Sequence, residues 1–241
     1  ISCLAGFTQP DSGELSVGDA EELVTLQGFQ SPSAALIAGV RTVFQNSSLV
    51  TEMTIDQNFA IANVDTFGFV SLTERLLCEP LTLSRKVSSL DLGARHIVEI
   101  ARAILAKPRV LLLDEPTALV SSESASRLMR VLHELAAGQT AVLLVTHRID
   151  DAVSVADAFT VLRSGRVKSS FRRDQFAGDV VALRTHLTDS MFGEGLQLVE
   201  RPALRENSQE SLVVSAHNLY SEAVLGDCGI TGVSFEIAQG E

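Results

Sequence analysis

The sequence predicts an α/β protein with a mostly parallel sheet, for three reasons. Strand-like and helix-like segments alternate through most of the chain, which is typical of parallel strands joined by crossover helices. Short runs of consecutive apolar residues, such as VLLL at 110–113, have the composition of strands buried on both faces. With 241 residues and 46% hydrophobic content, the chain is also long enough to bury a substantial core.

Three of the predicted strands are buried, and two more form a hairpin. The buried strands are expected at 40–44 (VRTVF), 110–113 (VLLL) and 141–145 (AVLLV). The hairpin is expected from 159–163 and 166–171, because a Ser-Gly pair separates the two runs.

Helices are predicted between the strands from apolar residues at helical spacing. Over 93–106 and 122–136 the apolar residues recur every three or four positions and give each helix one buried face. The residues expected on those two faces are Ile97, Ile100, Ala101, Ile104, Leu128, Val131, Leu132 and Leu135.

The composition changes near residue 193, which indicates a domain boundary. Residues 194–211 are polar and contain Gly, Pro, Glu and Asn, so a linker is expected there. A new pattern of two strands then begins, LVVSAHNL followed by GVSFEIAQGE. We therefore expect one domain over 1–193 and the opening strands of another over 212–241.

Charge and cysteine content exclude several classes of function. The formal net charge is −11 and the basic residues are scattered, so no nucleic-acid partner is expected. The cysteines, Cys3, Cys78 and Cys228, form no C-x-x-C motif, which argues against a zinc ribbon. No apolar run approaches the ~20 residues of a membrane span, and the first residues lack the pattern of a signal peptide.

Two acidic residues end the most apolar strand, in the stretch VLLLDEPTA at 110–118. Ligands of open parallel sheets bind beyond the carboxyl ends of the strands. Asp114 is therefore a candidate for holding Mg²⁺ through water, and Glu115 a candidate for polarising an attacking water. The alternative is a buried strand that ends in an acidic turn.

Two further polar residues follow predicted strands and are candidates for the same site. His147 ends the stretch AVLLVTHR, and neighbouring strand ends would bring it near the same phosphate. Gln45, in VFQNSSLV, carries a neutral amide that can reach both Mg²⁺ and the water. The alternatives are a capping histidine and a glutamine without function.

The fourth motif is a glycine-containing turn, LDLGA at 90–94, which opens an amphipathic helix. The N-terminus of a helix is a ready site for an anion. Asp91 favours the opposite interpretation, because aspartate is a good N-cap and its charge repels a phosphate. From the residues alone, both interpretations stay open.

In this order and at these spacings, the four motifs resemble those of an ABC-transporter ATPase domain, which has the P-loop NTPase fold. VFQNSSLVTEMTIDQN is similar to the glutamine loop of the tandem sugar importers of the ribose, xylose and galactose type. VEIARAILAKPRVLLLDEPTA is similar to their Walker B segment. The resemblance covers nearly the whole chain and implies a helical subdomain over about 52–105.

The resemblance implies a role for each matching residue near the ATP of this domain. Glu115 is the catalytic base, and His147 is the switch histidine that senses the γ-phosphate. Asp114 is the Walker B carboxylate that holds Mg²⁺. Gln45 is the glutamine-loop residue and a further ligand of the metal.

The signature, which in this family contacts the ATP of the opposing domain, is matched by Leu90, Asp91, Leu92 and Gly93. Asp91 replaces a serine there and adds like charge; at ~4 Å and an effective dielectric near 20, the repulsion is on the order of 4 kcal/mol. Ser121 stands in the D-loop, where many ABC proteins have Asp. We therefore expect one competent and one degenerate ATP site in the parent protein.

The phosphate-binding motif G-x-x-x-x-G-K-[ST] does not occur in these 241 residues. The chain is therefore expected to lie between the P-loops of two ABC domains and to be inactive by itself. The missing P-loop strand is expected beside the Walker B strand, where its loss leaves a gap at the centre of the sheet. Residues 212–237 are a candidate to fill that gap.

The resemblance implies a subunit that hydrolyses ATP, with Mg²⁺, to power the import of a sugar. Its implied partners are membrane permease subunits, the second ABC domain of the same polypeptide and, indirectly, a periplasmic or extracellular sugar-binding protein. It would lie peripherally on the cytoplasmic side of a bacterial cell membrane. The alternative is a non-transport, nucleotide-binding regulatory protein of the ABC family, whose relatives generally carry charged insertions and basic faces that this chain lacks.

The glutamine loop and the helices from about 54 to 83 are expected to face the permease. The alternative is that their apolar residues belong to the core of the helical subdomain. The residues concerned are Ile55, Phe59, Phe67, Phe69, Leu76 and Leu77.

Overall fold

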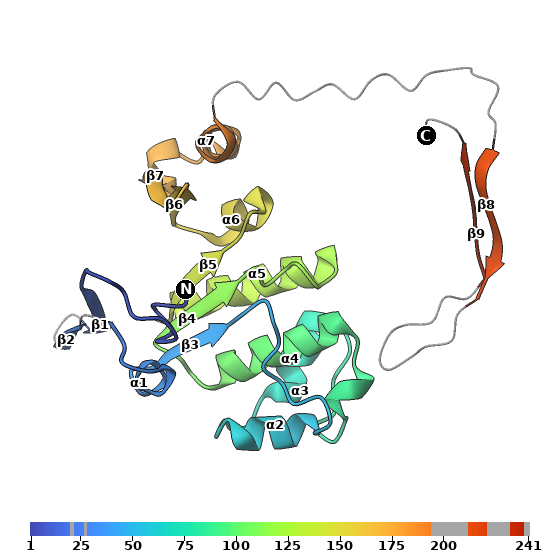
Figure 1. Ribbon diagram of the computed structural model, residues 1–241, viewed down its shortest axis with the longest axis horizontal. Helices are drawn as coiled ribbons and strands as arrows, with labels where there is room; N and C mark the ends of the chain where they lie inside the picture. Colours follow the sequence, from blue (N-terminus) through green and yellow to red (C-terminus); the bar gives the residue numbers. More distant parts are fainter. Residues whose placement is uncertain (20–21, 27, 194–211, 221–231, 239–241) are drawn as a thin grey trace. The chain divides into compact units, whose positions relative to one another are not determined.

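The computed structural model describes residues 1–19, 22–26, 28–193, 212–220 and 232–238 (Figure 1). The chain divides into two compact units, Ile1–Asp157 and Ala158–Glu241. The boundary expected near residue 193 stays a prediction, and the expected linker lies outside the described residues. No helix in the described part of the chain is long and apolar enough to cross a bilayer.

Three parallel strands form the central sheet of the first unit, in the order β3, β4, β5 (Figure 1). They are β3 (Val40–Val43), β4 (Val110–Asp114) and β5 (Ala141–Val145), and they confirm the three strands predicted in this part of the chain. The middle residues of β4 are buried, as a central strand requires.

Two predictions about this sheet are wrong. β4 is hydrogen-bonded to β3 on one side and to β5 on the other, so no gap lies beside it. β5 pairs only with β4 among the described strands, and its residues are alternately exposed and half-buried rather than buried throughout. Leu143 and Val145 are each 41% exposed, because β5 is an edge strand in the described part of the chain.

The segment between β3 and β4 forms a group of helices that lie together below the sheet in Figure 1. These are α2 (Ile55–Ile61), α3 (Phe69–Leu77), the short η1 (Val87–Ser89) and α4 (Leu92–Leu105). α2 begins at Thr54 with a capping box, in which Thr54 and Gln57 satisfy each other's backbone N–H groups.

Most of the apolar residues expected to face a permease belong to the core instead. Ile55, Phe59, Phe69 and Leu76 are fully buried, and Phe59 packs edge-to-face on Phe69 with ring centroids 5.2 Å apart. Burial of these large side chains supplies the hydrophobic stabilisation of the helical group. Leu77 is partly buried against the same core, and only Phe67 of the six is largely exposed, at 88%.

The helices that follow β4 and β5 complete this core. α5 (Ser122–Ala137) buries Leu128, Val131 and Leu132, and α4 buries Ile97, Ile100, Ala101 and Ile104, as their spacing predicts. α6 (Ile149–Val155) follows β5.

A smaller core lies at the N-terminal end of the first unit. β1 (Leu15–Asp19) and β2 (Glu22–Leu26) form an antiparallel pair, and α1 (Pro32–Ile37) follows them. The buried residues of this core are Ala5, Phe29, Ala35, Val40 and Leu112. It joins the N-terminal segment to β3 and β4.

The second unit contains two antiparallel pairs. β6 (Ala158–Arg163) and β7 (Arg166–Arg172) confirm the predicted hairpin, and η2 (Arg173–Phe176) and α7 (Val180–Phe192) follow.

The two strands expected to open a further domain are present as β8 (Leu212–Leu219) and β9 (Val233–Ala238). They pair with each other in a sheet of their own. The hypothesis that residues 212–237 supply a strand to the central sheet stays a prediction.

Candidate active site at the ends of β4 and β5

The register of β4 and β5 brings their terminal polar residues together. Asp114, the last residue of β4, is paired with Val145, the last residue of β5. The next residue, Glu115, donates its backbone N–H to the Val145 carbonyl over 2.9 Å. Its φ of 51° lies in the left-handed region, which is uncommon for a residue other than glycine and concentrates at functional sites.

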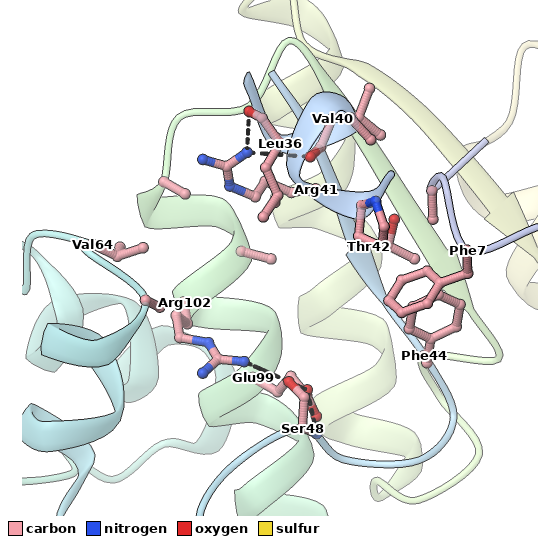
Figure 2. A pocket seen from close by; sticks show the side chains of 16 residues that line it. Phe7, Leu36, Val40, Arg41, Thr42, Phe44, Ser48, Val64, Glu99 and Arg102 are labelled. Carbon is pink, nitrogen blue, oxygen red and sulfur yellow. Dashed lines mark hydrogen bonds and ion pairs between the residues drawn. The ribbon is translucent and has the colours of Figure 1, made fainter. Parts of the chain in front are cut away.

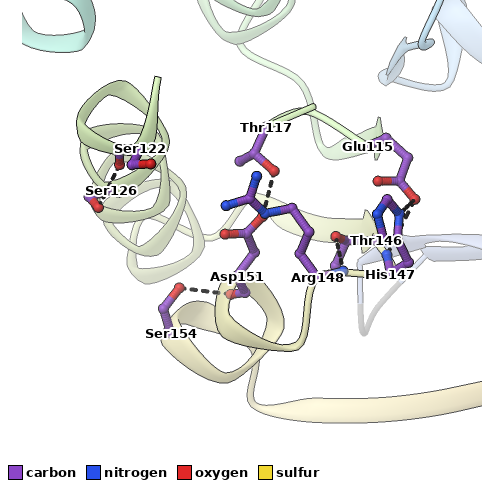
Figure 3. A network of polar contacts seen from close by, with 9 residues as sticks. All are labelled: Glu115, Thr117, Ser122, Ser126, Thr146, His147, Arg148, Asp151 and Ser154. Atoms are coloured by element: carbon purple, nitrogen blue, oxygen red, sulfur yellow. Dashed lines mark hydrogen bonds and ion pairs between the residues drawn. The ribbon is translucent and has the colours of Figure 1, made fainter. Parts of the chain in front are cut away.

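Glu115 and His147 form a close pair beyond the strand ends (Figure 3). The Nδ1 atom of His147 lies 2.7 Å from Oε1 of Glu115, and the backbone N–H of His147 donates to the same oxygen over 3.3 Å. A carboxylate only accepts hydrogen bonds, so Nδ1 carries the proton and Nε2 is left for another partner. His147 thus lies beside Glu115, while the roles expected for the two residues stay predictions.

The other carboxylate oxygen of Glu115 is unpartnered. Oε2 is buried and accepts no hydrogen bond from the described residues. A buried acceptor without a donor is costly, and such atoms call for a ligand, a water or a catalytic explanation. The Glu115 side chain is 19% exposed and that of His147 75%, so the pair is reachable from solvent.

Asp114 and Gln45 differ in how well they fit a metal. Asp114 is half-buried at the end of β4, where a carboxylate suits Mg²⁺ held through water. Gln45 follows β3, whose last residue Val43 is paired with Leu113, and so begins its loop at the same edge of the sheet. Its side chain is exposed and hydrogen-bonds to none of the described residues, so the structure does not join it to Asp114 or Glu115.

The signature stretch is built as an ordinary helix start. Asp91 is the N-cap of α4, and its Oδ1 accepts the backbone N–H of Ala94 over 2.7 Å. Leu90 is fully buried, whereas Leu92 is 57% exposed. The N-cap interpretation of Asp91 is therefore confirmed, and its carboxylate remains at an exposed turn.

The D-loop packs against this turn. A Cβ atom placed on Gly93 would lie 2.8 Å from the carbonyl oxygen of Leu119, so only glycine allows the two segments to approach this closely. Ser121 is the N-cap of α5, and its hydroxyl accepts the N–H of Ser124 over 3.2 Å. Ser121 therefore has a structural role as a helix cap. The absence of the Asp that many ABC proteins have in the D-loop does not indicate this role.

One polar cluster around the buried Glu99, behind the glutamine loop, was missed from the sequence. Oε1 of Glu99, on α4, accepts from the backbone N–H and the hydroxyl of Ser48 over 2.8 and 2.5 Å. Arg102 donates to the same hydroxyl over 2.6 Å. Burial lowers the pKa of Arg102, and the Glu99 carboxylate partly opposes that shift. The available signal was an acidic residue among the buried positions of α4.

A second missed cluster joins the loop after β4 to the start of α6. The Thr117 hydroxyl donates a short hydrogen bond to Oδ2 of Asp151, and Nε of Arg148 lies 3.2 Å from that oxygen (Figure 3). No local pattern indicates this contact, because its partners are 34 residues apart.

Comparison with known proteins places these features in a family. Residues 1–118 match the model of the ABC transporter family. The chain is 31% identical over 198 residues to the arabinose import ATP-binding protein AraG 2 of Burkholderia thailandensis, covering 75% of this chain and 37% of the relative. It is 33% identical over 186 residues to the ribose import ATP-binding protein RbsA 1 of Mesorhizobium japonicum, covering 71% and 35%.

Another relative is matched along the entire chain. The ribose import ATP-binding protein RbsA 1 of Rhizobium johnstonii is 28% identical over 256 residues, covering 100% of this chain and 46% of the relative. The chain thus spans less than half the length of these relatives.

Solved structures support the same fold. A nucleotide-free ATP-binding cassette from an ABC transporter superposes with a TM-score of 0.60 at 22% identity, over 75% of this chain and 78% of the other. A dimeric ATP-binding cassette bound to ADP and phosphate gives 0.59 at 20% identity, over 71% and 78%. The fold, the sequence match and the paired residues at the ends of β4 and β5 agree, and the chain belongs to the ABC transporter family, within its ATP-binding domain.

Proposed function

We propose that Glu115 is the catalytic base of an ATPase site, with His147 as the residue that orients it and senses the γ-phosphate. The observation that carries this proposal is the unequal state of the two Glu115 oxygens. Oε1 is held by His147, while Oε2 is buried without a partner. A carboxylate held on one side and free on the other is suited to accept a proton from a water.

Mg²⁺ and the nucleotide would be held at this edge by few residues of the described chain. Asp114 supplies a carboxylate for Mg²⁺, and Gln45 can reach the metal only if its loop moves. Bound Mg²⁺ neutralises charge on the phosphates. The β- and γ-phosphates also require a phosphate-binding loop, whose motif is absent from the 241 residues.

The intact protein then drives the import of a sugar, most simply a monosaccharide such as those named for its relatives. It acts as a peripheral subunit on the cytoplasmic side of a bacterial membrane, beneath permease subunits and fed indirectly by a sugar-binding protein. Its second ABC domain belongs to the same polypeptide, and residues 212–241 are the start of that domain. The first ABC domain supplies Glu115, the carboxylate proposed for catalysis, and a signature that Asp91 weakens.

A groove in the first unit is the proposed contact with the permease (Figure 2). Its volume is about 320 Å³, and it lies between the N-terminal segment, β3, the end of α2 and α4. Much of its lining is apolar, including Phe7, Leu36, Phe44, Val64 and Ala106.

The groove combines aromatic side chains with a cluster of polar side chains. Phe7 is 63% exposed and stands edge-on to Phe44, with ring centroids 5.3 Å apart. The lining also contains the Ser48–Glu99–Arg102 cluster, so the groove borders the glutamine loop directly (Figure 2). Exposed apolar residues next to a polar cluster suit contact with another protein segment.

The proposed contact can be tested with Leu36→Glu in the intact protein expressed with its permease. Leu36 is 47% exposed on the groove, so an acid there should disfavour docking without disturbing the core. We expect loss of membrane association and transport, with ATP turnover retained. Leu162→Glu, on β6 at a residue 71% exposed, is the matched control. Normal membrane association of Leu36→Glu would exclude the groove.

The ATPase proposal itself is tested by phosphate release from the purified intact protein in MgATP. We expect steady turnover that depends on Mg²⁺. Absence of hydrolysis in the presence of the permease and a transported sugar would contradict the proposed function.

A further inference from the structure

Two separate bridges connect the loop after β4 with the segment that follows β5, which comprises a short loop and α6. The first is the Glu115–His147 pair. The second runs from Thr117, two residues beyond Glu115, to Asp151, with Arg148 on the same carboxylate oxygen (Figure 3).

The Thr117–Asp151 contact of the second bridge is buried, whereas the side chain of Arg148 is 41% exposed and that of His147 75%. Thr117 is 1% exposed and Asp151 7%. Charge-assisted hydrogen bonds gain strength where water is excluded, and a buried carboxylate is costly unless it is fully partnered. Asp151 therefore fixes the donors around it: the hydroxyl of Thr117 and the guanidinium of Arg148.

Hydrogen bonds and an ion pair hold the two residues that flank His147, Thr146 and Arg148. Before it, the Thr146 hydroxyl accepts the backbone N–H of Arg148 over 2.9 Å. After it, Arg148 is tied to Asp151, which lies within α6. Displacing Asp151 would release the segment that presents His147 to Glu115.

The two bridges also bracket Pro116, so they set the path of the backbone between Glu115 and Thr117. Glu115 already has the left-handed φ of 51°, which the surrounding contacts must maintain. A hydrogen bond at Thr117 is well placed to maintain it.

We propose that Thr117 and Asp151 are positioning residues for hydrolysis, which hold Glu115 and His147 in their mutual geometry. This rests on the proposed ATPase function, and neither residue is required to touch nucleotide. Their loss should therefore slow the chemical step and leave ATP binding nearly intact, because small misplacements of a catalytic group reduce turnover strongly.

The decisive comparison uses Thr117→Val and Thr117→Ser in the intact protein. Valine keeps the shape and removes the hydroxyl, whereas serine retains the hydroxyl. We expect Thr117→Val to lower kcat about tenfold with KM for ATP within about twofold, and Thr117→Ser to restore turnover. Asp151→Asn should behave as Thr117→Val does.

Ser154→Ala is the control for a general loss of structure. The Ser154 hydroxyl donates to the backbone carbonyl of Asp151 over 2.7 Å and leaves the carboxylate untouched. Its kcat should equal that of the wild type even if its melting temperature falls. Equal turnover of Thr117→Val and the wild type, or failure of serine to restore turnover, would overturn the proposal.

A second readout does not depend on hydrolysis. Selective ¹⁵N-histidine labelling reports the tautomer of His147, with His147→Asn identifying its resonances. We expect the Nδ1–H form in the wild type, Thr117→Ser and Ser154→Ala, and a shift toward the commoner Nε2–H form in Thr117→Val. An unchanged tautomer in Thr117→Val would contradict the positioning role, and inactivity of the wild type would instead contradict the ATPase proposal.

Discussion

The carboxylate that follows β4 and the carboxylate at the start of α4 differ in their hydrogen bonding. Glu115 sits in a left-handed backbone position and leaves one buried oxygen without a partner. Asp91 lies in an extended position and uses its carboxylate to cap a helix. An acidic residue near an expected phosphate is therefore not evidence of catalysis by itself. What distinguishes the two is whether the oxygens are already satisfied by the protein.

The largest expected effect comes from Glu115→Gln in the intact protein. The amide keeps the size of the side chain and cannot accept a proton from water, so hydrolysis should fall at least ~100-fold while ATP still binds. Phosphate release and equilibrium binding of labelled ATP would measure the two properties. Turnover equal to that of the wild type would remove Glu115 from catalysis.

Gly93→Ala should have the next largest effect, on stability. Its Cβ would lie 2.8 Å from the Leu119 carbonyl oxygen, and relieving that overlap is expected to cost about 1–3 kcal/mol in the free energy of unfolding. Gly138→Ala is the control, because its Cβ would meet no atom closer than 3.4 Å. Denaturant unfolding of the intact protein would compare them, and equal stability would mean that the signature and D-loop are not tightly packed.

Asp91→Ser should have a moderate effect on activity and little on stability. Serine is also a good N-cap, so α4 should be retained, while the like charge at the opposing ATP site is removed. We expect turnover to rise about twofold as a second site becomes active. Asp91→Ala separates the two roles, because it should lose about 1 kcal/mol of stability while also removing the charge. Unchanged turnover in both variants would leave Asp91 a cap only.

The smallest expected effect concerns His96, behind the signature turn. Burial lowers its pKa from 6.5, although Glu99 and the Pro116 backbone partly oppose this. The unfolded chain therefore binds more protons below pH ~6.5, and the stability linked to this residue should be lost as the pH falls through that value toward the folded pKa. His96→Gln should flatten the fall, and His133→Gln, at an exposed position, should not. An identical pH profile in His96→Gln would refute the assignment.

The spacing of apolar residues along the sequence correctly predicted the buried residues of two helices and one strand. α4 and α5 bury the faces that their spacing indicates, and β4 is central as its apolar run indicates. β5 has the same kind of apolar run, yet Leu143 is 41% exposed because burial of a strand depends on its neighbours.

The candidate site was predictable in part for the same reason. Glu115 and His147 follow strands, and a parallel register brings such residues together. The contacts between Ser48 and Glu99 and between Thr117 and Asp151 join residues 51 and 34 positions apart and follow no periodicity. The places of Glu99 and Asp151 in their helices could not identify Ser48 and Thr117 as their partners.

The most direct test of the difference between Glu115 and Asp91 is the number of nucleotides trapped in the intact protein. Vanadate with MgATP captures ADP only at sites that hydrolyse. We predict one ADP per chain in the wild type, none at this site in Glu115→Gln, and two in Asp91→Ser. Two trapped nucleotides in the wild type would contradict the account, because Asp91 would then leave the opposing site competent.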